Sequence, residues 1–241
     1  MARSSKPQPR QLSLQVHLDD DATFANFLTA ADSSNRETLQ LLDRQLDSGG
    51  ESSVYIWGPT GAGISHLLQA ACHTAGLRGA IAQYLPLRSM QEFSPFELMQ
   101  QLESLDLVCV DDVQVIAASD DWEQALFHTF NRLRDNGKRL LLGGHCNPRQ
   151  LGLRLPDLQS RFNGSLVLQV QPLDDAGKAR ALCARAGNLG MDMSDDVARF
   201  ILSRWSRDTH NLFACLRCLD RLSLEQQRRL SIPFVKQALG I

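Results

Sequence analysis

The stretch that decides the fold is GPTGAGIS, residues 58–65. It follows the apolar run VYIW (residues 54–57) and precedes HLLQAA (residues 66–71), which has the composition of a helix. Its spacing is that of a phosphate-binding loop, G-x-x-x-x-G-K-[ST], with Ile64 in the place of the lysine. A strand, a glycine-rich loop and a helix in this order predict an α/β fold with a cradle for phosphate groups.

The chemistry of such a loop shows which phosphate-binding groups this sequence keeps and which one it lacks. Backbone N–H groups and the following helix N-terminus point at a diphosphate, and a serine such as Ser65 turns its hydroxyl toward magnesium. The missing ammonium would reach the β and γ phosphates, a contact worth about 1.5–3 kcal/mol. We therefore expect weak binding of ADP at most, with Mg²⁺ only where nucleotide is bound. The candidate nucleotide-binding residues of the segment are Thr60, Gly61, Ala62, Gly63, Ile64, Ser65 and His66. A glycine-rich turn without a ligand is the alternative interpretation.

A second motif, LVCVDD (residues 107–112), has the form of a buried strand that ends in two carboxylates. Asp111 would hold magnesium through water, and Asp112 stands where a water-activating acid usually lies. An apolar strand with acidic residues at its exit is the simpler interpretation. The order and separation of the two motifs together favour a nucleotide pocket. The cysteines predict no metal site, because the CLRC segment (residues 215–218) has no second pair to complete one.

The rest of the chain alternates strand-like and helix-like segments as far as Pro172, which predicts a parallel sheet flanked by helices. The expected strands are Val54–Trp57, Ala80–Leu85, Leu105–Val110, Arg139–Gly143 and Leu166–Val170. After Pro172 four amphipathic segments predict a small all-helical domain. We expect a disordered tail over residues 1–17, an α/β domain over 18–172 and a helical lid over 173–241.

Composition and charge exclude several classes of function. With 43% hydrophobic and 22% charged residues, the chain is typical of soluble globular proteins. It has no apolar run near the roughly 18 residues of a membrane span, and its basic N-terminus lacks the apolar stretch of a signal peptide. We expect a cytoplasmic protein without membrane contact. The formal net charge of −2 predicts that DNA contact is indirect or weak.

Several segments in the same order resemble the AAA+ region of the DnaA/Hda family of bacterial replication proteins. They are TFANF (23–27), GPTGAGISHLLQAA (58–71), VDDVQ (110–114), FHTFN (127–131) and LQSRF (158–162). The resemblance runs from about residue 22 to the C-terminus. It implies an AAA+ sheet followed by a helical lid. The interaction domain and helix-turn-helix domain of an initiator have no counterpart in this sequence, which implies a DnaA-related regulator.

The resemblance gives roles to two further segments. The stretch QLSLQV (residues 11–16) is similar to the peptide by which the family docks on the sliding clamp, the β subunit of DNA polymerase. In that role its contacts come from Gln11, Leu12, Ser13, Leu14 and Val16. In LQSRF, Arg161 would project as an arginine finger into the nucleotide site of a neighbour. An N-terminal edge strand and a solvated arginine are the plain alternatives.

The sequence also departs from the family pattern where the γ-phosphate would be contacted or sensed. Ile64 replaces the loop lysine, His145 stands at the sensor I position, and His210 replaces the sensor II arginine. The resemblance therefore implies a negative regulator that binds the DNA-loaded clamp and stimulates ATP hydrolysis by DnaA, without being an autonomous enzyme. Two alternatives stay open: an autonomous ATPase of the helicase-loader type and a DNA-binding initiator paralogue. The sequence does not decide the oligomeric state.

Overall fold

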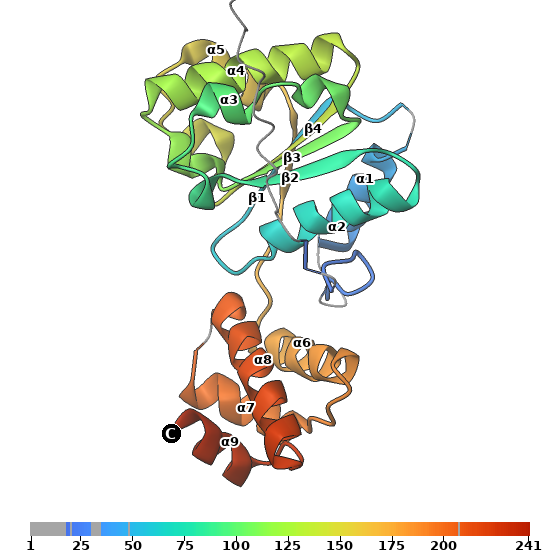
Figure 1. Cartoon of the computed structure of the whole chain (residues 1–241), viewed down its shortest axis with the longest axis vertical. Coiled ribbons are helices and arrows are strands. Elements are labelled where there is room, and N and C mark those ends of the chain that lie inside the picture. The colour runs from blue at the N-terminus through green and yellow to red at the C-terminus, as the bar shows by residue number, and fades with distance from the viewer. Residues whose placement is uncertain (1–17, 20, 30–34, 48, 207) are drawn as a thin grey trace, which may run out of the picture.

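The structure is a computed structural model that describes residues 18–19, 21–29, 35–47, 49–206 and 208–241, together with the backbone but not the side chain of His210. The predicted tail and clamp peptide, residues 1–17, lie outside the described residues. Figure 1 shows an α/β half at the top and a cluster of four helices at the bottom, joined by the segment that follows β5 (Leu166–Gln169).

Five parallel strands form one sheet in the order β2-β3-β4-β1-β5. Their bounds are Ser53–Trp57 for β1, Ala82–Pro86 for β2, Leu107–Asp111 for β3, Arg139–Gly144 for β4 and Leu166–Gln169 for β5. Each predicted strand coincides with an observed one, with ends that differ by at most two residues. The predicted fold class, a parallel sheet flanked by helices and followed by an all-helical part, is confirmed.

Both faces of the sheet are buried, which explains why its strands are apolar along their whole length. In β1, Val54 and Ile56 join one core cluster, while Tyr55 joins the other. The first face is covered by α1 (Asn35–Gln45) and α2 (Ile64–Leu77), and the second by α3 (Pro95–Leu98), α4 (Asp120–Asp135) and α5 (Pro156–Asn163) (Figure 1). Short 3-10 helices occupy Leu87–Ser89, Leu102–Ser104, Val113–Ile116 and Pro148–Gln150.

The helical lid has a hydrophobic cluster of its own. It consists of α6 (Asp175–Asn188), α7 (Asp195–Arg204), α8 (Thr209–Gln226) and α9 (Ile232–Leu239). Each of these helices starts where a short polar side chain accepts a hydrogen bond from a backbone N–H three residues on. The four capping residues are Asp174, Ser194, Asp208 and Ser231. No helix within the described ranges has both the length and the apolar character that a membrane crossing requires.

Candidate functional site: a cleft between the phosphate-binding loop and the lid

The glycine loop lies at the carboxyl end of β1, where the strand order changes direction. In open α/β sheets, this is the place where ligands bind. A cavity of about 720 Å³ opens here between the loop and the lid, and a smaller one of about 150 Å³ continues from it. All seven candidate residues of the loop segment, Thr60 to His66, line the larger cavity. Their role in nucleotide binding stays a prediction.

The loop needs its glycines for conformation and for space. Gly61 and Gly63 have φ values of 82° and 94°, in the left-handed region that favours glycine. A Cβ atom on Gly63 would lie 2.6 Å from the ring of Phe27. The hydroxyl of Thr209, in the lid, donates a hydrogen bond of 3.1 Å to the carbonyl oxygen of Gly61. The loop is thus held between the N-terminal segment and the lid.

Ile64 fills the position of the missing lysine with an apolar side chain that is only 5% exposed. It belongs to the core cluster under α2. A Cβ atom built on Gly143 of β4 would lie 2.8 Å from a methyl of Ile64 and 2.9 Å from a carboxylate oxygen of Asp111. Ile64 and Asp111 thus both lie close to the Gly143 backbone, which leaves no room for a side chain there.

Asp111 lies beneath the cleft and is satisfied within the protein. The hydroxyl of Tyr84, from β2, donates a hydrogen bond of 2.6 Å to Oδ2, and the Asp112 backbone N–H donates one of 2.8 Å to Oδ1. Asp111 is 3% exposed. Burial raises the pKa of its carboxyl above the usual 3.8, and hydrogen bonds from Ser65 and Tyr84 counter part of that rise.

Asp112 reaches the wall of the larger cavity but is also engaged. Arg88 donates to both of its oxygens, from Nε over 3.1 Å and from Nη2 over 3.2 Å. Gln114 donates to Oδ1 over 2.6 Å, and Nε2 of His145 lies 3.5 Å from the same atom. The second acidic residue of the motif is thus paired with the Arg88 cation, and His145, the residue predicted at the sensor I position, contacts it.

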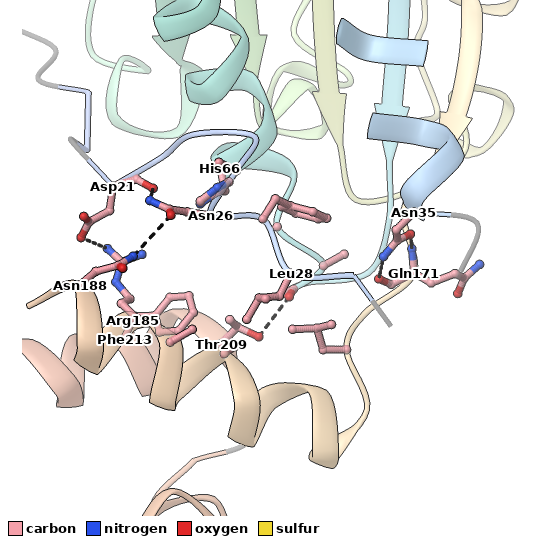
Figure 2. Close-up of a pocket in the computed structure, with 18 residues that line it drawn as sticks. Asp21, Asn26, Leu28, Asn35, His66, Gln171, Arg185, Asn188, Thr209 and Phe213 are labelled. Carbon is pink, nitrogen blue, oxygen red and sulfur yellow. Dashed lines mark hydrogen bonds and ion pairs between the residues drawn. The ribbon is translucent and has the colours of Figure 1, made fainter. Parts of the chain in front are cut away.

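The smaller cavity is walled by the N-terminal segment, the loop and the lid (Figure 2). Asp21 faces Arg185 of α6 in an ion pair of 3.4 Å, and Asn26 accepts a hydrogen bond of 3.4 Å from Asn188. The Arg185 guanidinium lies over the Phe213 ring, 4.6 Å from its centre. These side chains join the two halves of the chain around an amphipathic cavity.

His66 helps to position the N-terminal segment. Its Nε2 lies 2.8 Å from the carbonyl oxygen of Thr23, and its ring is 5.6 Å from that of Phe27. Burial lowers the pKa of His66 below the usual 6.5, although the bond to Thr23 opposes this shift. A neutral ring whose Nε2–H donates to Thr23 fits this environment.

Two predicted residues lie elsewhere. Arg161 is in the last turn of α5, is half-buried and does not line either cavity of the cleft. Its guanidinium makes no ion pair or hydrogen bond with another described residue. His210 is the second residue of α8, and its side chain lies outside the described residues.

Sequence reasoning missed Tyr84, Arg88, Arg185 and Arg217, all of which line the larger cavity. For Arg217 a signal existed, because it lies seven residues, or two helical turns, after His210 in the same helix. Tyr84 and Arg88 carry no such signal, since their position depends on how β2 pairs with β3.

Comparison with known families agrees with this geometry. Residues 18–169 match the sequence model of the bacterial DnaA ATPase domain, and residues 175–239 match that of the Hda lid domain. The chain belongs to the DnaA/Hda family. The resemblance inferred from the motifs is thereby confirmed, and the lid match places the chain with Hda within the family.

Solved structures show the same fold. Domain III of DnaA from Thermotoga maritima is 22% identical, with a TM-score of 0.78 over 93% of this chain and 98% of that one. AMPPCP-bound DnaA from Aquifex aeolicus is 24% identical, with a TM-score of 0.68 over 87% of this chain and 69% of that one. The Holliday junction motor RuvB from Thermotoga maritima is more distant, at 14% identity and a TM-score of 0.63 over 86% and 69% of the two chains.

The buried Asp111 leads to a prediction about stability. Because the folded protein binds this proton more tightly than the unfolded chain, the free energy of unfolding falls as pH rises through the raised pKa. Asp111→Asn removes that loss, and the Tyr84 hydroxyl can accept from the new amide. We expect the variant to melt at a higher temperature at neutral pH, by about 2–4 °C for each kcal/mol gained.

Thermal melts at several pH values check this expectation. The gain should vanish at pH values below 3.8, where the carboxyl is protonated in both states. Asp112→Asn is the matched control, since it makes the same change at the neighbouring carboxylate that is paired with Arg88. A variant Asp111→Asn that melts lower than the parent chain at neutral pH would contradict the prediction.

Proposed function

We propose that this chain is a negative regulator of replication initiation that acts on ATP bound to DnaA. The observation that carries the proposal is the separation of two features within one DnaA/Hda-family chain. The phosphate-binding loop lacks its lysine and has a buried Ile64 instead, while Arg161 lies on α5, outside the lining of the chain's own cleft. An incomplete site, together with an arginine elsewhere that pairs with no other described residue, favours action on the nucleotide of a partner.

The physical role proposed for Arg161 is charge stabilisation. A guanidinium that enters a neighbouring nucleotide site meets the charge that develops on the transferring phosphoryl group, and such an arginine finger accelerates hydrolysis by roughly 10³- to 10⁵-fold. DnaA would supply the bound ATP and the attacking water. The product would be ADP–DnaA, the inactive form of the initiator. The chain itself would not be an autonomous ATPase.

The clamp peptide, residues 11–16, completes the proposal. It would attach the regulator to the DNA-loaded β subunit of the polymerase and thereby confine its action to replicating DNA in the cytoplasm. DNA contact would be indirect, through the clamp. An extended peptide whose leucines fill hydrophobic pockets is a common means of such docking.

We further propose that the cleft retains a nucleoside diphosphate, such as ADP. The larger cavity adjoins the loop N–H groups and suits phosphates, whereas the smaller one, walled by Phe27, Leu173 and Phe213, suits a base. The DnaA relative from Aquifex aeolicus holds the nucleotide analogue AMPPCP. Without the lysine, we expect binding to be weaker than in a lysine-bearing relative.

A reconstituted hydrolysis assay tests the main proposal. Conversion of ATP to ADP on DnaA is measured with clamp-loaded DNA, with and without this chain, and with each component left out in turn. We expect fast conversion only when all components are present. ATP turnover by the chain alone would instead support the autonomous ATPase, and duplex binding that weakens steeply with salt would support the initiator paralogue.

A further inference from the structure

Ser65 and Asp111 are the two residues through which this type of loop would hold magnesium. In a magnesium-dependent loop, the serine or threonine hydroxyl binds the ion, and the acidic residue at the neighbouring strand end holds it. Both residue types are present here, at the start of α2 and at the end of β3. Whether the ion fits depends on what lies between them.

The Tyr84 hydroxyl contacts both residues, and Ser65 also contacts Asp111 directly. The Tyr84 hydroxyl donates to Asp111 Oδ2 over 2.6 Å, and the side chains of Ser65 and Gln69 are also its partners. Tyr84 is 7% exposed and belongs to the core cluster under α2. Its ring is thus packed in the core, which holds the hydroxyl at the Asp111 carboxylate.

This arrangement does not fit a hydrated magnesium ion. Mg²⁺ requires six oxygen ligands at about 2.0–2.1 Å and keeps several waters. The Tyr84 oxygen is at the distance from Asp111 at which a metal-bound water would lie, so the first of those waters has no place. The other Asp111 oxygen accepts the Asp112 N–H, and Asp112 is paired with Arg88. Each oxygen of the two carboxylates therefore already accepts a hydrogen bond from the protein.

Other groups can balance the charge of a diphosphate. The loop and the first turn of α2 offer backbone N–H groups. Arg217 of α8 lines the larger cavity, is exposed and makes no ion pair or hydrogen bond with any other described residue. A guanidinium is a permanent cation that binds phosphate oxygens in a bidentate manner.

We propose that the Tyr84 hydroxyl takes the place of the magnesium shell beside Ser65 and Asp111, so that this cleft binds nucleoside diphosphates without a divalent cation. The inference rests on the proposed retention of a diphosphate and adds that the site is independent of magnesium. It distinguishes this cleft from one that holds a nucleotide–magnesium complex, in which removal of the ion removes the nucleotide.

Calorimetric titration of the full chain with ADP, in Mg²⁺ buffer and in EDTA, tests the proposal. We expect the two dissociation constants to agree within about twofold. Tyr84→Phe removes the hydroxyl and leaves room for a water on Asp111. In that variant, ADP binding should become about tenfold or more tighter when Mg²⁺ is added, the worth of one charge-assisted contact.

Tyr55→Phe is the matched control, because its hydroxyl bonds the Cys146 carbonyl on the opposite face of the sheet. Its binding should stay independent of magnesium. If the parent chain binds ADP in Mg²⁺ but not in EDTA, the proposal is wrong while diphosphate retention stands. If it binds ADP in neither buffer, both are wrong. The titrations of the parent chain in Mg²⁺ and in EDTA test the proposal even if Tyr84→Phe does not fold. They are independent of the DnaA hydrolysis assay.

Discussion

Replacement of Arg161 by alanine is expected to lower the hydrolysis of DnaA-bound ATP that this chain stimulates by roughly 10³-fold or more. The arginine would be the group that meets the developing phosphoryl charge from this side of the interface. Its guanidinium makes no ion pair or hydrogen bond with another described residue, so the fold should survive. The measurement is the rate of ATP conversion on DnaA with clamp-loaded DNA.

Two companion variants make this test specific. Arg161→Lys should restore little activity, because an ammonium does not reproduce the planar fork of a guanidinium. Arg154→Ala removes a nearby exposed arginine, which is paired with Asp120 at 3.5 Å, and should leave stimulation nearly unchanged. An Arg161→Ala variant as active as the parent would exclude the finger and leave the chain only a scaffolding role.

The second large effect is expected at the N-terminal peptide. Leu12→Ala combined with Leu14→Ala removes two apolar anchors, each worth about 1.5–3 kcal/mol when fully buried. Clamp affinity should fall by roughly 10²- to 10⁴-fold. Surface plasmon resonance on immobilised clamp measures this directly, and circular dichroism shows whether the fold is intact.

The control for the peptide is Gln15→Ala, which changes the one residue of the stretch 11–16 to which no contact is assigned. It should bind the clamp almost as the parent does. Arg161→Ala should also bind the clamp normally, because its expected defect is in the stimulation of ATP hydrolysis. Unchanged clamp binding by the double leucine variant would disprove the docking peptide.

Local sequence patterns were sufficient to predict most of the fold. The apolar runs VYIW and LVCVD became β1 and β3 because strands buried on both faces need no polar alternation. The lid helices start at Asp174, Ser194, Asp208 and Ser231, residues whose side chains bond the first turn. The glycines of the loop predicted the junction of β1 and α2, and two of them, Gly61 and Gly63, have positive φ there.

The polar connections of the cleft could not be predicted in this way. The contact between Tyr84 and Asp111 depends on the register of β2 against β3, which sets Tyr84 beside Cys109. The ion pair between Asp21 and Arg185 joins residues far apart in the chain, through the packing of the lid on the N-terminal segment. Neither contact leaves a periodic pattern in the sequence. Only the folded structure therefore reveals that Asp111 already accepts hydrogen bonds from Tyr84 and from the Asp112 backbone.

The separate core of the lid has a consequence for how the molecule responds to mutation. Its cluster, which includes Leu182, Ile201 and Phe234, shares no residue with the two clusters of the sheet. The halves meet at the cleft through polar contacts such as Thr209 with Gly61, each worth only about 0.5–1.5 kcal/mol. We therefore expect the lid and the sheet to unfold as separate cooperative units. Damage to the lid core loosens one wall of the cleft while the sheet, and Arg161 on its far side, stay in place.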